Sequence, residues 1–317
     1  MKKILVLLLS SLFFIFQSCD KHETEIYINE KGNTKTDAEL VVKILSSDVK
    51  TKAIGYGDND YVETKISNAV IGTFFEDGKI NVIRNASFNE GAETKMTISL
   101  KSGKSRVYVV ANVNPDLFST VNTELEFKSV VLSLSQTVIP MTGNKSIDIL
   151  PNATTKETLE IERMVSKISL SKINIGFANN GYANTTYSID KVFLHNVNTK
   201  SSINYVTSNP KSGLTESSLL NLKESFFDPF DRHYFYGFES KLRLVVGGWF
   251  KEGNRAAEYI YYPVDIDAKH NTHYAIMMTL NGKGVSNPDD KFEASGKLDL
   301  TIKVIDWELE NLNPIFD

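Results

Sequence analysis

The sequence predicts an all-β protein built from β-sandwiches. Short segments in which apolar and polar residues alternate recur along residues 38–317, and this is the period of a strand with one buried face. Turn residues separate these segments, as in Glu76-Asp77-Gly78 and Lys101-Ser102-Gly103. Helical patterns are few and short. Many short strands with so little helix favour β-sandwiches over an α/β enzyme core.

The first predicted strand is Ala38–Ser47, in which Leu40, Val42 and Ile44 point to one face. The further predicted strands share this alternation and are Ile66–Phe75, Lys79–Asn85, Lys95–Leu100, Arg106–Ala111, Glu157–Ile175, Tyr187–Asn196, Leu242–Phe250, Glu258–Val264, His273–Leu280 and Lys297–Trp307. The predicted helices each lie near a Ser, Thr or Asn cap and are Pro115–Thr120, Glu124–Leu134 and Glu216–Leu222.

A domain boundary is expected near Asn152–Thr155, where a loop-like stretch precedes a renewed strand pattern. The sequence therefore predicts two β-sandwich domains, 38–155 and 156–317. The chain contains a single cysteine, so no disulfide can form within it. Stability must come from hydrophobic cores.

The N-terminus has the pattern of a secretory signal. Lys2 and Lys3 are followed by an apolar run from Ile4 to Phe16, which is too short to span a bilayer comfortably. Cys19 ends this signal, so we expect a signal peptide at 1–18 and a lipoprotein whose acylated Cys19 contacts outer-membrane lipid. Ordinary cleavage nearby, which would leave Cys19 as a stray thiol, is the alternative. The polar residues 19–37 are predicted to form a flexible tether.

Composition describes a soluble globular protein, with 41% hydrophobic and 23% charged residues. A net charge of −4 gives no electrostatic reason to expect nucleic acid as a partner. No later segment approaches transmembrane length.

Candidate metal ligands are weak. His270 and His273 are three residues apart, but the residues that follow alternate as a strand, which points the two side chains to opposite faces. The Asp58-Asn59-Asp60 run resembles part of a calcium loop without the required glutamate, and we interpret it as a turn. Asn287–Asp290 is also predicted to be a turn. We therefore expect no metal site.

No nucleophile elbow, P-loop or dinucleotide-binding glycine pattern stands in a convincing context. His22, His195 and His233 lie far apart, so no catalytic triad is indicated, and we expect a protein that is not an enzyme and has no cofactor. Aromatic residues gather late in the chain at Tyr234, Phe235, Tyr236, Phe238, Trp249, Tyr259, Tyr261 and Tyr262. They are interpreted as core, with a carbohydrate-binding platform as the alternative.

Several segments, in this order, resemble the FimA-type major fimbrial subunits (fimbrillins) of Bacteroidetes. They span nearly the whole mature chain and are Ala38–Leu45, Thr51–Ala53, Ile66–Phe75, Arg106–Asn112, Ile139–Gly143, Glu162–Ile168, Asn271–Tyr274 and Val304–Trp307. The resemblance implies two transthyretin-like β-sandwich domains and a subunit of a type V pilus. Its partners would be other pilus subunits and an extracellular trypsin-like protease.

In that family the subunit reaches the cell surface as a lipoprotein, and the protease removes the N-terminal segment with its first strand. A strand from a neighbouring subunit then fills the groove. Here the removable strand would carry Leu40, Val42 and Ile44, whose loss exposes ~5–9 kcal/mol of apolar contact. Cleavage in that family typically follows an arginine, but here no arginine precedes Arg84. We therefore expect cleavage after Lys50 or Lys52, preferably between Lys52 and Ala53.

The donor strand is expected in the C-terminal tail, whose apolar residues are Leu309, Leu312, Ile315 and Phe316. These residues could instead cap the last strand, which would make the chain an anchor or tip subunit. Two other readings stay open: a glycan-binding surface lipoprotein, and an extracytoplasmic hydrolase.

Overall fold

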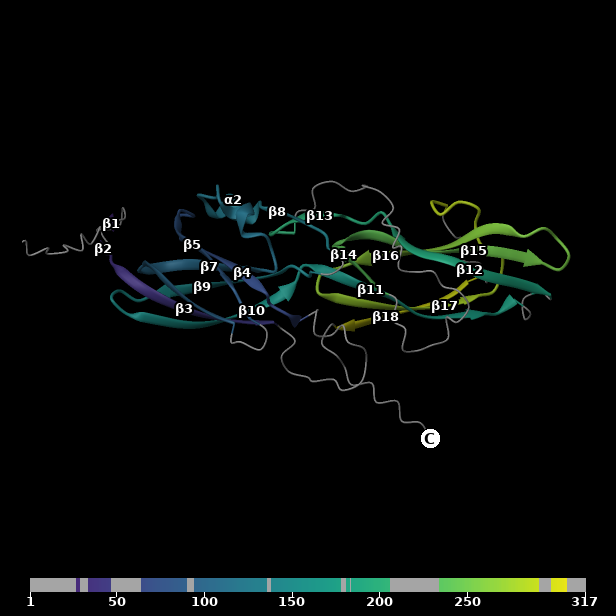
Figure 1. The fold of residues 1–317 in the computed structure, drawn as a ribbon, viewed down its shortest axis with the longest axis horizontal. Helices are drawn as coiled ribbons and strands as arrows, with labels where there is room; N and C mark the ends of the chain where they lie inside the picture. Colours follow the sequence, from purple (N-terminus) through teal and green to yellow (C-terminus); the bar gives the residue numbers. More distant parts are fainter. Residues whose placement is uncertain are drawn as a thin grey trace, which may run out of the picture.

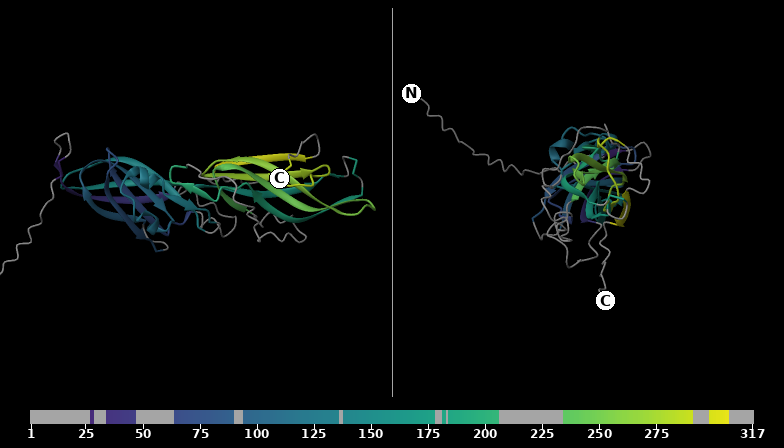
Figure 2. Two further views of the ribbon diagram at one scale, coloured as in Figure 1. Left: turned by 90° about the horizontal axis from the view of Figure 1, so that it is seen from above. Right: turned by 90° about the vertical axis from the view of Figure 1, so that its right-hand side faces the viewer.

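A computed structural model describes residues 27–28, 34–46, 64–89, 94–135, 138–177, 181–182, 184–205, 234–290 and 298–306. Two groups of strands lie end to end along the molecule, N-terminal strands in purple to teal at one end and C-terminal strands in green to yellow at the other (Figure 1). The view from above shows the same succession, so the described part is elongated (Figure 2). No helix in this part is long and apolar enough to cross a membrane.

The N-terminal group forms one seven-stranded sheet in the order β5-β4-β7-β9-β10-β3-β6. Its strands are β3 (Asp37–Ser46), β4 (Asn68–Phe75), β5 (Ile80–Ser87), β6 (Lys95–Lys101), β7 (Gly103–Ala111), β9 (Met141–Ile149) and β10 (Thr154–Arg163). β10 joins the two halves of this sheet, because residues 154–161 run parallel to β3 while residues 162–163 pair antiparallel with β9. One apolar core receives side chains from both halves, which together form the N-terminal sandwich. A small antiparallel pair, β1 (Tyr27–Ile28) and β2 (Thr34–Lys35), precedes the strands of this sheet in the chain.

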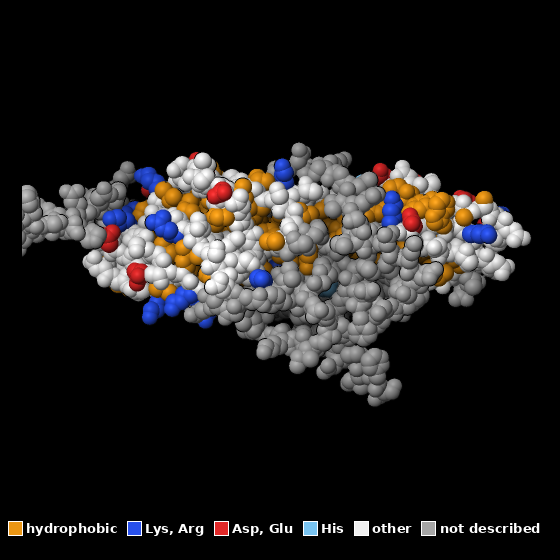
Figure 3. Space-filling model, in the orientation of Figure 1, with side chains coloured by type: hydrophobic (Ala, Val, Ile, Leu, Met, Phe, Trp, Pro, Cys, Tyr) orange, Lys and Arg blue, Asp and Glu red, His pale blue; other side chains and the backbone are white. Residues whose placement is uncertain are grey.

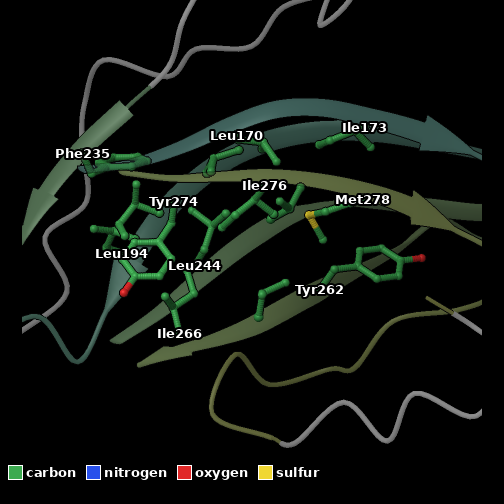
Figure 4. Close-up of a cluster of buried hydrophobic side chains, with 14 of the residues drawn as sticks. Leu170, Ile173, Leu194, Phe235, Leu244, Tyr262, Ile266, Tyr274, Ile276 and Met278 are labelled. Carbon is green, nitrogen blue, oxygen red and sulfur yellow. The ribbon is translucent and has the colours of Figure 1, made fainter. Parts of the chain in front are cut away.

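The C-terminal group contains two sheets, ordered β14-β11-β17-β18 and β12-β15-β16. The first comprises β11 (Val165–Ile175), β14 (Tyr234–Phe238), β17 (Thr272–Leu280) and β18 (Leu298–Asp306), and the second β12 (Thr185–His195), β15 (Ser240–Glu252) and β16 (Glu258–Ala268). Buried side chains of the two sheets meet in a shared core (Figure 4). Those labelled include Leu170, Ile276 and Met278 from one sheet and Leu194, Leu244 and Ile266 from the other. This arrangement is a β-sandwich.

A third apolar cluster joins the two groups. It includes Phe74 and Val110 of the N-terminal sheet together with Val165, Tyr236 and Phe238 of the C-terminal one. Nearby, β8 (Val131–Ser133) pairs antiparallel with β13 (Lys200–Ser202), which is a second crossing between the two parts. The joint is therefore packed with buried side chains.

Two short helices cover the N-terminal sheet, η1 (Pro115–Phe118) and α2 (Glu124–Lys128). Thr123 and Glu126 form a capping box at the start of α2. The predicted helix Glu124–Leu134 is wrong beyond Lys128. Its last part forms β8, because the β-branched Val130-Val131 pair favours an extended chain.

The prediction of an all-β fold is confirmed, and the main differences concern strand limits. The strand expected at Glu157–Ile175 is interrupted at Met164, because β10 and β11 belong to different sheets. The predicted domain division between residues 155 and 156 falls inside β10. Since β10 pairs with β3 and β9, all of this strand belongs to the N-terminal sheet.

β9 was not expected from the sequence. Its central residues Gly143, Asn144 and Lys145 are not apolar, and only the ends of the strand are buried. The predicted helix Glu216–Leu222 lies outside the described residues.

Candidate functional site: the slot of the first strand

β3 lies between two partners in the N-terminal sheet. It runs parallel to β10, with Leu40 opposite Thr155 and Ile44 opposite Leu159. On its other side it runs antiparallel to β6, with Leu40 opposite Ile98 and Val42 opposite Met96. The first strand of the domain is therefore an internal strand of the finished sheet.

Alternate side chains of β3 enter the core. Leu40, Val42 and Ile44 are each 0% exposed, which confirms that these three share the buried face. They contribute to the same apolar core as Ile98 and Leu100 of β6 and Leu159 and Ile161 of β10. Between them, Val41 and Leu45 are partly exposed and Lys43 is exposed.

Further hydrogen bonds hold both ends of β3. The Glu39 amide donates to the Ala153 carbonyl at 3.1 Å, and the Ile44 amide donates to the Thr94 carbonyl at 2.9 Å. The Thr154 hydroxyl donates to the Glu39 carboxylate at 2.8 Å. Backbone pairing and apolar burial thus both fix the position and register of the strand.

Removing β3 would leave a slot with a defined chemistry. β10 and β6 would each expose a row of unpaired backbone groups, and three apolar sites would open between them. Such a slot binds an extended chain by β-augmentation and selects one with alternating apolar residues. A strand that replaced β3 in the same direction would lie parallel to β10 and antiparallel to β6.

A strand with that pattern occurs at the other end of the chain. Among the described strands β18 pairs only with β17, so it is the edge strand of its sheet there. Its sequence, Leu-Asp-Leu-Thr-Ile-Lys-Val-Ile from Leu298, has apolar residues at the third, fifth and seventh positions, as does Ala-Glu-Leu-Val-Val-Lys-Ile-Leu from Ala38. Both share an acidic second residue, a third-position leucine and a lysine at Lys43 or Lys303. The sequence prediction missed this correspondence, although comparing the two strands directly would have revealed it.

The other predicted processing residues lie outside the described residues. These are Cys19, the cleavage residues Lys50, Lys52 and Ala53, and the tail residues Leu309, Leu312, Ile315 and Phe316. Their roles stay predictions.

The late aromatic residues do not form one cluster. Phe235, Tyr236, Phe238 and Tyr262 are buried, as the core interpretation predicted. Trp249, by contrast, is 50% exposed and meets the Tyr259 ring edge-on at 5.0 Å between centroids. Tyr261 continues this row, 5.2 Å from Tyr259. Figure 3 shows hydrophobic side chains reaching the surface at the end that carries β12 and β15.

The two candidate histidines have different partners. His273 Nε2 lies 2.8 Å from the Ser169 hydroxyl, whereas His270 Nδ1 lies 2.8 Å from the Glu239 carboxylate. Within the described residues, no three His, Cys, Asp or Glu side chains gather as metal ligands. Residues 287–290 do form a turn, closed by the Asp290 amide donating to the Asn287 carbonyl at 3.1 Å.

A buried carboxylate supports α2 against the N-terminal sheet. Glu124 accepts a hydrogen bond from the Tyr108 hydroxyl at 2.5 Å and pairs with Arg106. Burial, followed by the contact with Glu124, raises the pKa of the Tyr108 phenol to about 12. Two side chains of β7 thus hold the buried Glu124 carboxylate, and this gives the cluster a structural role.

Comparison with known proteins agrees with this architecture. Residues 38–171 match the family model "Major fimbrial subunit protein (FimA)". The fold is similar to a fimbrilin from Porphyromonas gingivalis W83, with a TM-score of 0.63 and 18% identity over 85% of this chain and 98% of that chain. No curated protein matches in sequence.

Two further solved structures share the fold. One is the tip fimbrial protein Mfa3 from Porphyromonas gingivalis, with a TM-score of 0.55 and 13% identity over 86% of this chain and 100% of that chain. The other is a fimbrial assembly protein from Parabacteroides distasonis, with a TM-score of 0.52 and 17% identity over 86% and 98% of the two chains. The family match supports the resemblance to fimbrial major subunits over residues 38–171, and the solved structures show that the fold is shared.

Proposed function

We propose that this chain is a structural subunit of a surface fimbria that polymerises by strand exchange. β3 leaves the N-terminal sheet after proteolysis, and a strand of the next subunit fills the slot between β10 and β6. The complete burial of Leu40, Val42 and Ile44 carries this proposal, because it makes the opened slot strongly apolar. The proposed role is structural and involves no catalysis.

The donor in this proposal is β18 with the tail that follows it. In the part of the chain that the structure describes, β18 is an edge strand paired with β17 alone. In the slot it would pair on both sides and place Leu300, Ile302 and Val304 at the positions of Leu40, Val42 and Ile44. The tail residues Leu309, Leu312, Ile315 and Phe316 would extend the same strand beyond the slot. The exchange therefore adds one complete ladder of hydrogen bonds.

Export and release complete the proposed sequence of events. Acylated Cys19 would hold the subunit at the outer membrane, and a trypsin-like protease would cut between Lys52 and Ala53. N-terminal sequencing of subunits recovered from surface fibres tests this step. We expect the chain to begin at Ala53. Fibres whose subunits still carry residues 37–46 would contradict the removal of β3.

A matched pair of variants separates the cleavage site from other effects. Lys50→Gln with Lys52→Gln should leave the subunit uncut, anchored and unpolymerised. Lys43→Gln changes an exposed lysine of β3 and should leave polymerisation unchanged.

Deleting residues 298–317, which removes the proposed donor strand, should stop fibre growth in a stalk subunit. If the deleted chain still entered fibres, the subunit would be an anchor or tip protein.

A second candidate function is carbohydrate binding on the outer face of β15 and β16. The half-exposed Trp249 beside Tyr259 and Tyr261 favours it, because aromatic rings stack on the apolar faces of sugars. Binding of the purified chain to a glycan array tests this function. We expect Trp249→Ala to abolish any binding and Leu125→Ala, at an exposed leucine on α2, to leave it unchanged.

A further inference from the structure

A group of charged side chains lies at the joint between the two sandwiches. His270 belongs to the turn between β16 and β17, and its imidazole stacks on the Tyr205 ring with 4.0 Å between centroids and 19° between planes. Glu162 comes from β10 in the N-terminal sheet. Glu239 comes from the junction of β14 and β15 in the C-terminal part. These four residues are called the joint cluster below.

Each ring nitrogen of His270 faces a different carboxylate. Nδ1 lies 2.8 Å from Glu239 Oε2, and Nε2 lies 3.6 Å from Glu162 Oε1. The second oxygen of Glu239 accepts from Lys269 Nζ at 2.9 Å. The Tyr205 hydroxyl donates to Glu162 Oε1 at 3.4 Å. The imidazole therefore lies between carboxylates from both sandwiches, one at each ring nitrogen.

A neutral imidazole cannot satisfy this arrangement. It carries one N–H and one lone pair, so one nitrogen would present its lone pair to a carboxylate. The imidazolium ion donates from both nitrogens and attracts both charges. Protonation therefore converts a contact within one sandwich into a bridge between two.

We propose that His270 is a proton-operated clamp that fastens the N-terminal sandwich to the C-terminal one. This inference concerns the joint within one subunit and does not depend on polymerisation. When His270 is protonated, Glu162 and Glu239 are held by one cation and the joint is stiff. When the proton leaves, the bridge to Glu162 is lost and the joint loosens.

The neighbouring carboxylates favour the protonated form of His270. The nearby Glu162 carboxylate, opposed by partial burial and assisted by Glu239, raises the pKa of His270 above 6.5. The proximity of the His270 imidazole in turn lowers the pKa of Glu162. Because the folded pKa is the higher one, the clamp stabilises fully below about 6.5 and its contribution is lost as pH rises through the folded value.

The remaining neighbours do not titrate in this range. Lys269 is held by Glu239, and its pKa is raised. Arg163, beside Glu162, is buried and has its pKa lowered only to about 10, while its guanidinium donates to Asn271 at 3.4 Å. The Asn271 amide also donates to the Val165 carbonyl at 2.9 Å. These contacts and the apolar joint persist at high pH, so the clamp sets stiffness and does not separate the sandwiches.

Two measurements on the full chain test the clamp. The first is NMR titration of the His270 ring, which should give a pKa above that of free histidine. Glu162→Gln should lower this pKa, and Glu239→Gln should lower it as well. A His270 pKa at or below the free value in the unmodified chain would overturn the proposal without any variant.

The second measurement follows the distance between the two sandwiches. Spin labels at Lys95→Cys on β6 and Lys251→Cys on β15, in a Cys19→Ser background, report the distance distribution between the sandwiches. We expect this distribution to broaden as pH rises through the pKa of His270, and to be broad at every pH in Glu162→Gln or His270→Gln. His195→Gln, on β12, serves as the control and should behave like the parent chain. A distribution that is equally narrow at both pH extremes in the parent chain would overturn the clamp.

Discussion

Leu40 of β3 lies directly opposite Ile98 of β6, and both side chains are buried in the N-terminal core. This pair couples the first strand to the sheet that it would have to leave. The strand is therefore stable in the uncut subunit, and its departure would create a binding slot of matching shape.

Leu40→Ala should destabilise the uncut subunit by about 2–5 kcal/mol, because it leaves a cavity between β3 and β6. Urea unfolding followed by circular dichroism measures the change. Val41→Ala is the matched control, since Val41 is partly exposed on the other face of the strand. Equal losses for the two variants would show that the buried face of β3 is not what holds it.

A peptide with the sequence of residues 37–46 should inhibit polymerisation of processed subunits, because it fits the slot in the original register. Light scattering during fibre assembly measures the effect. The same peptide with serine in place of Leu40, Val42 and Ile44 keeps the backbone but loses the apolar anchors, and should not inhibit. Inhibition by both peptides would argue against a selective slot.

Gly143→Ala should be more damaging than Gly72→Ala. A Cβ at Gly143 would lie 2.2 Å from the Glu160 carbonyl oxygen in β10, which is backbone and cannot rotate away. At Gly72 the nearest atom is in the Phe127 ring, at 2.6 Å, and a ring can shift. We expect about 1–3 kcal/mol for Gly72→Ala and more for Gly143→Ala. Thermal unfolding ranks the two variants, and the reverse order would contradict the close approach of β9 to β10.

The Tyr108 phenol should titrate at about 12, above the ordinary value of 10.0. Because the folded pKa is the higher one, its contribution to stability is present below 10 and is lost as pH rises towards 12. Ultraviolet titration of tyrosinate, with Tyr108→Phe to identify the signal, measures this. Glu124→Gln removes a negative charge and should lower the pKa. An unchanged Tyr108 pKa in Glu124→Gln would show that Glu124 contributes little to the raised pKa.

Much of the fold followed from local patterns in the sequence. Strict alternation at Leu40, Val42 and Ile44 predicted both a strand and its buried face, because only one strand face meets the core. The break at Met164 could not be predicted in the same way. β10 and β11 both alternate, and their separation depends on which strands each one pairs with.

The joint cluster was also beyond local patterns. In the sequence, His270 stands out only through its spacing from His273, and its partners Glu162 and Glu239 are distant along the chain. The exposure of Trp249 depends on which sheet face remains uncovered, and this is a tertiary property. The likeness of β18 to β3, by contrast, is present in the sequence itself.

Disulfide trapping between subunits tests strand exchange most directly. If β18 replaces β3 in register, Thr301 of one subunit takes the place of Val41, which lies opposite Thr97 of β6. Within one chain Thr301 pairs instead with Met277 of β17. Fibres assembled from mixed Thr97→Cys and Thr301→Cys subunits should therefore contain disulfide-linked dimers. Asp299→Cys in place of Thr301→Cys moves the cysteine two residues along the strand and should give few disulfide-linked dimers. Fibres that form normally without a Thr97–Thr301 crosslink would contradict the account.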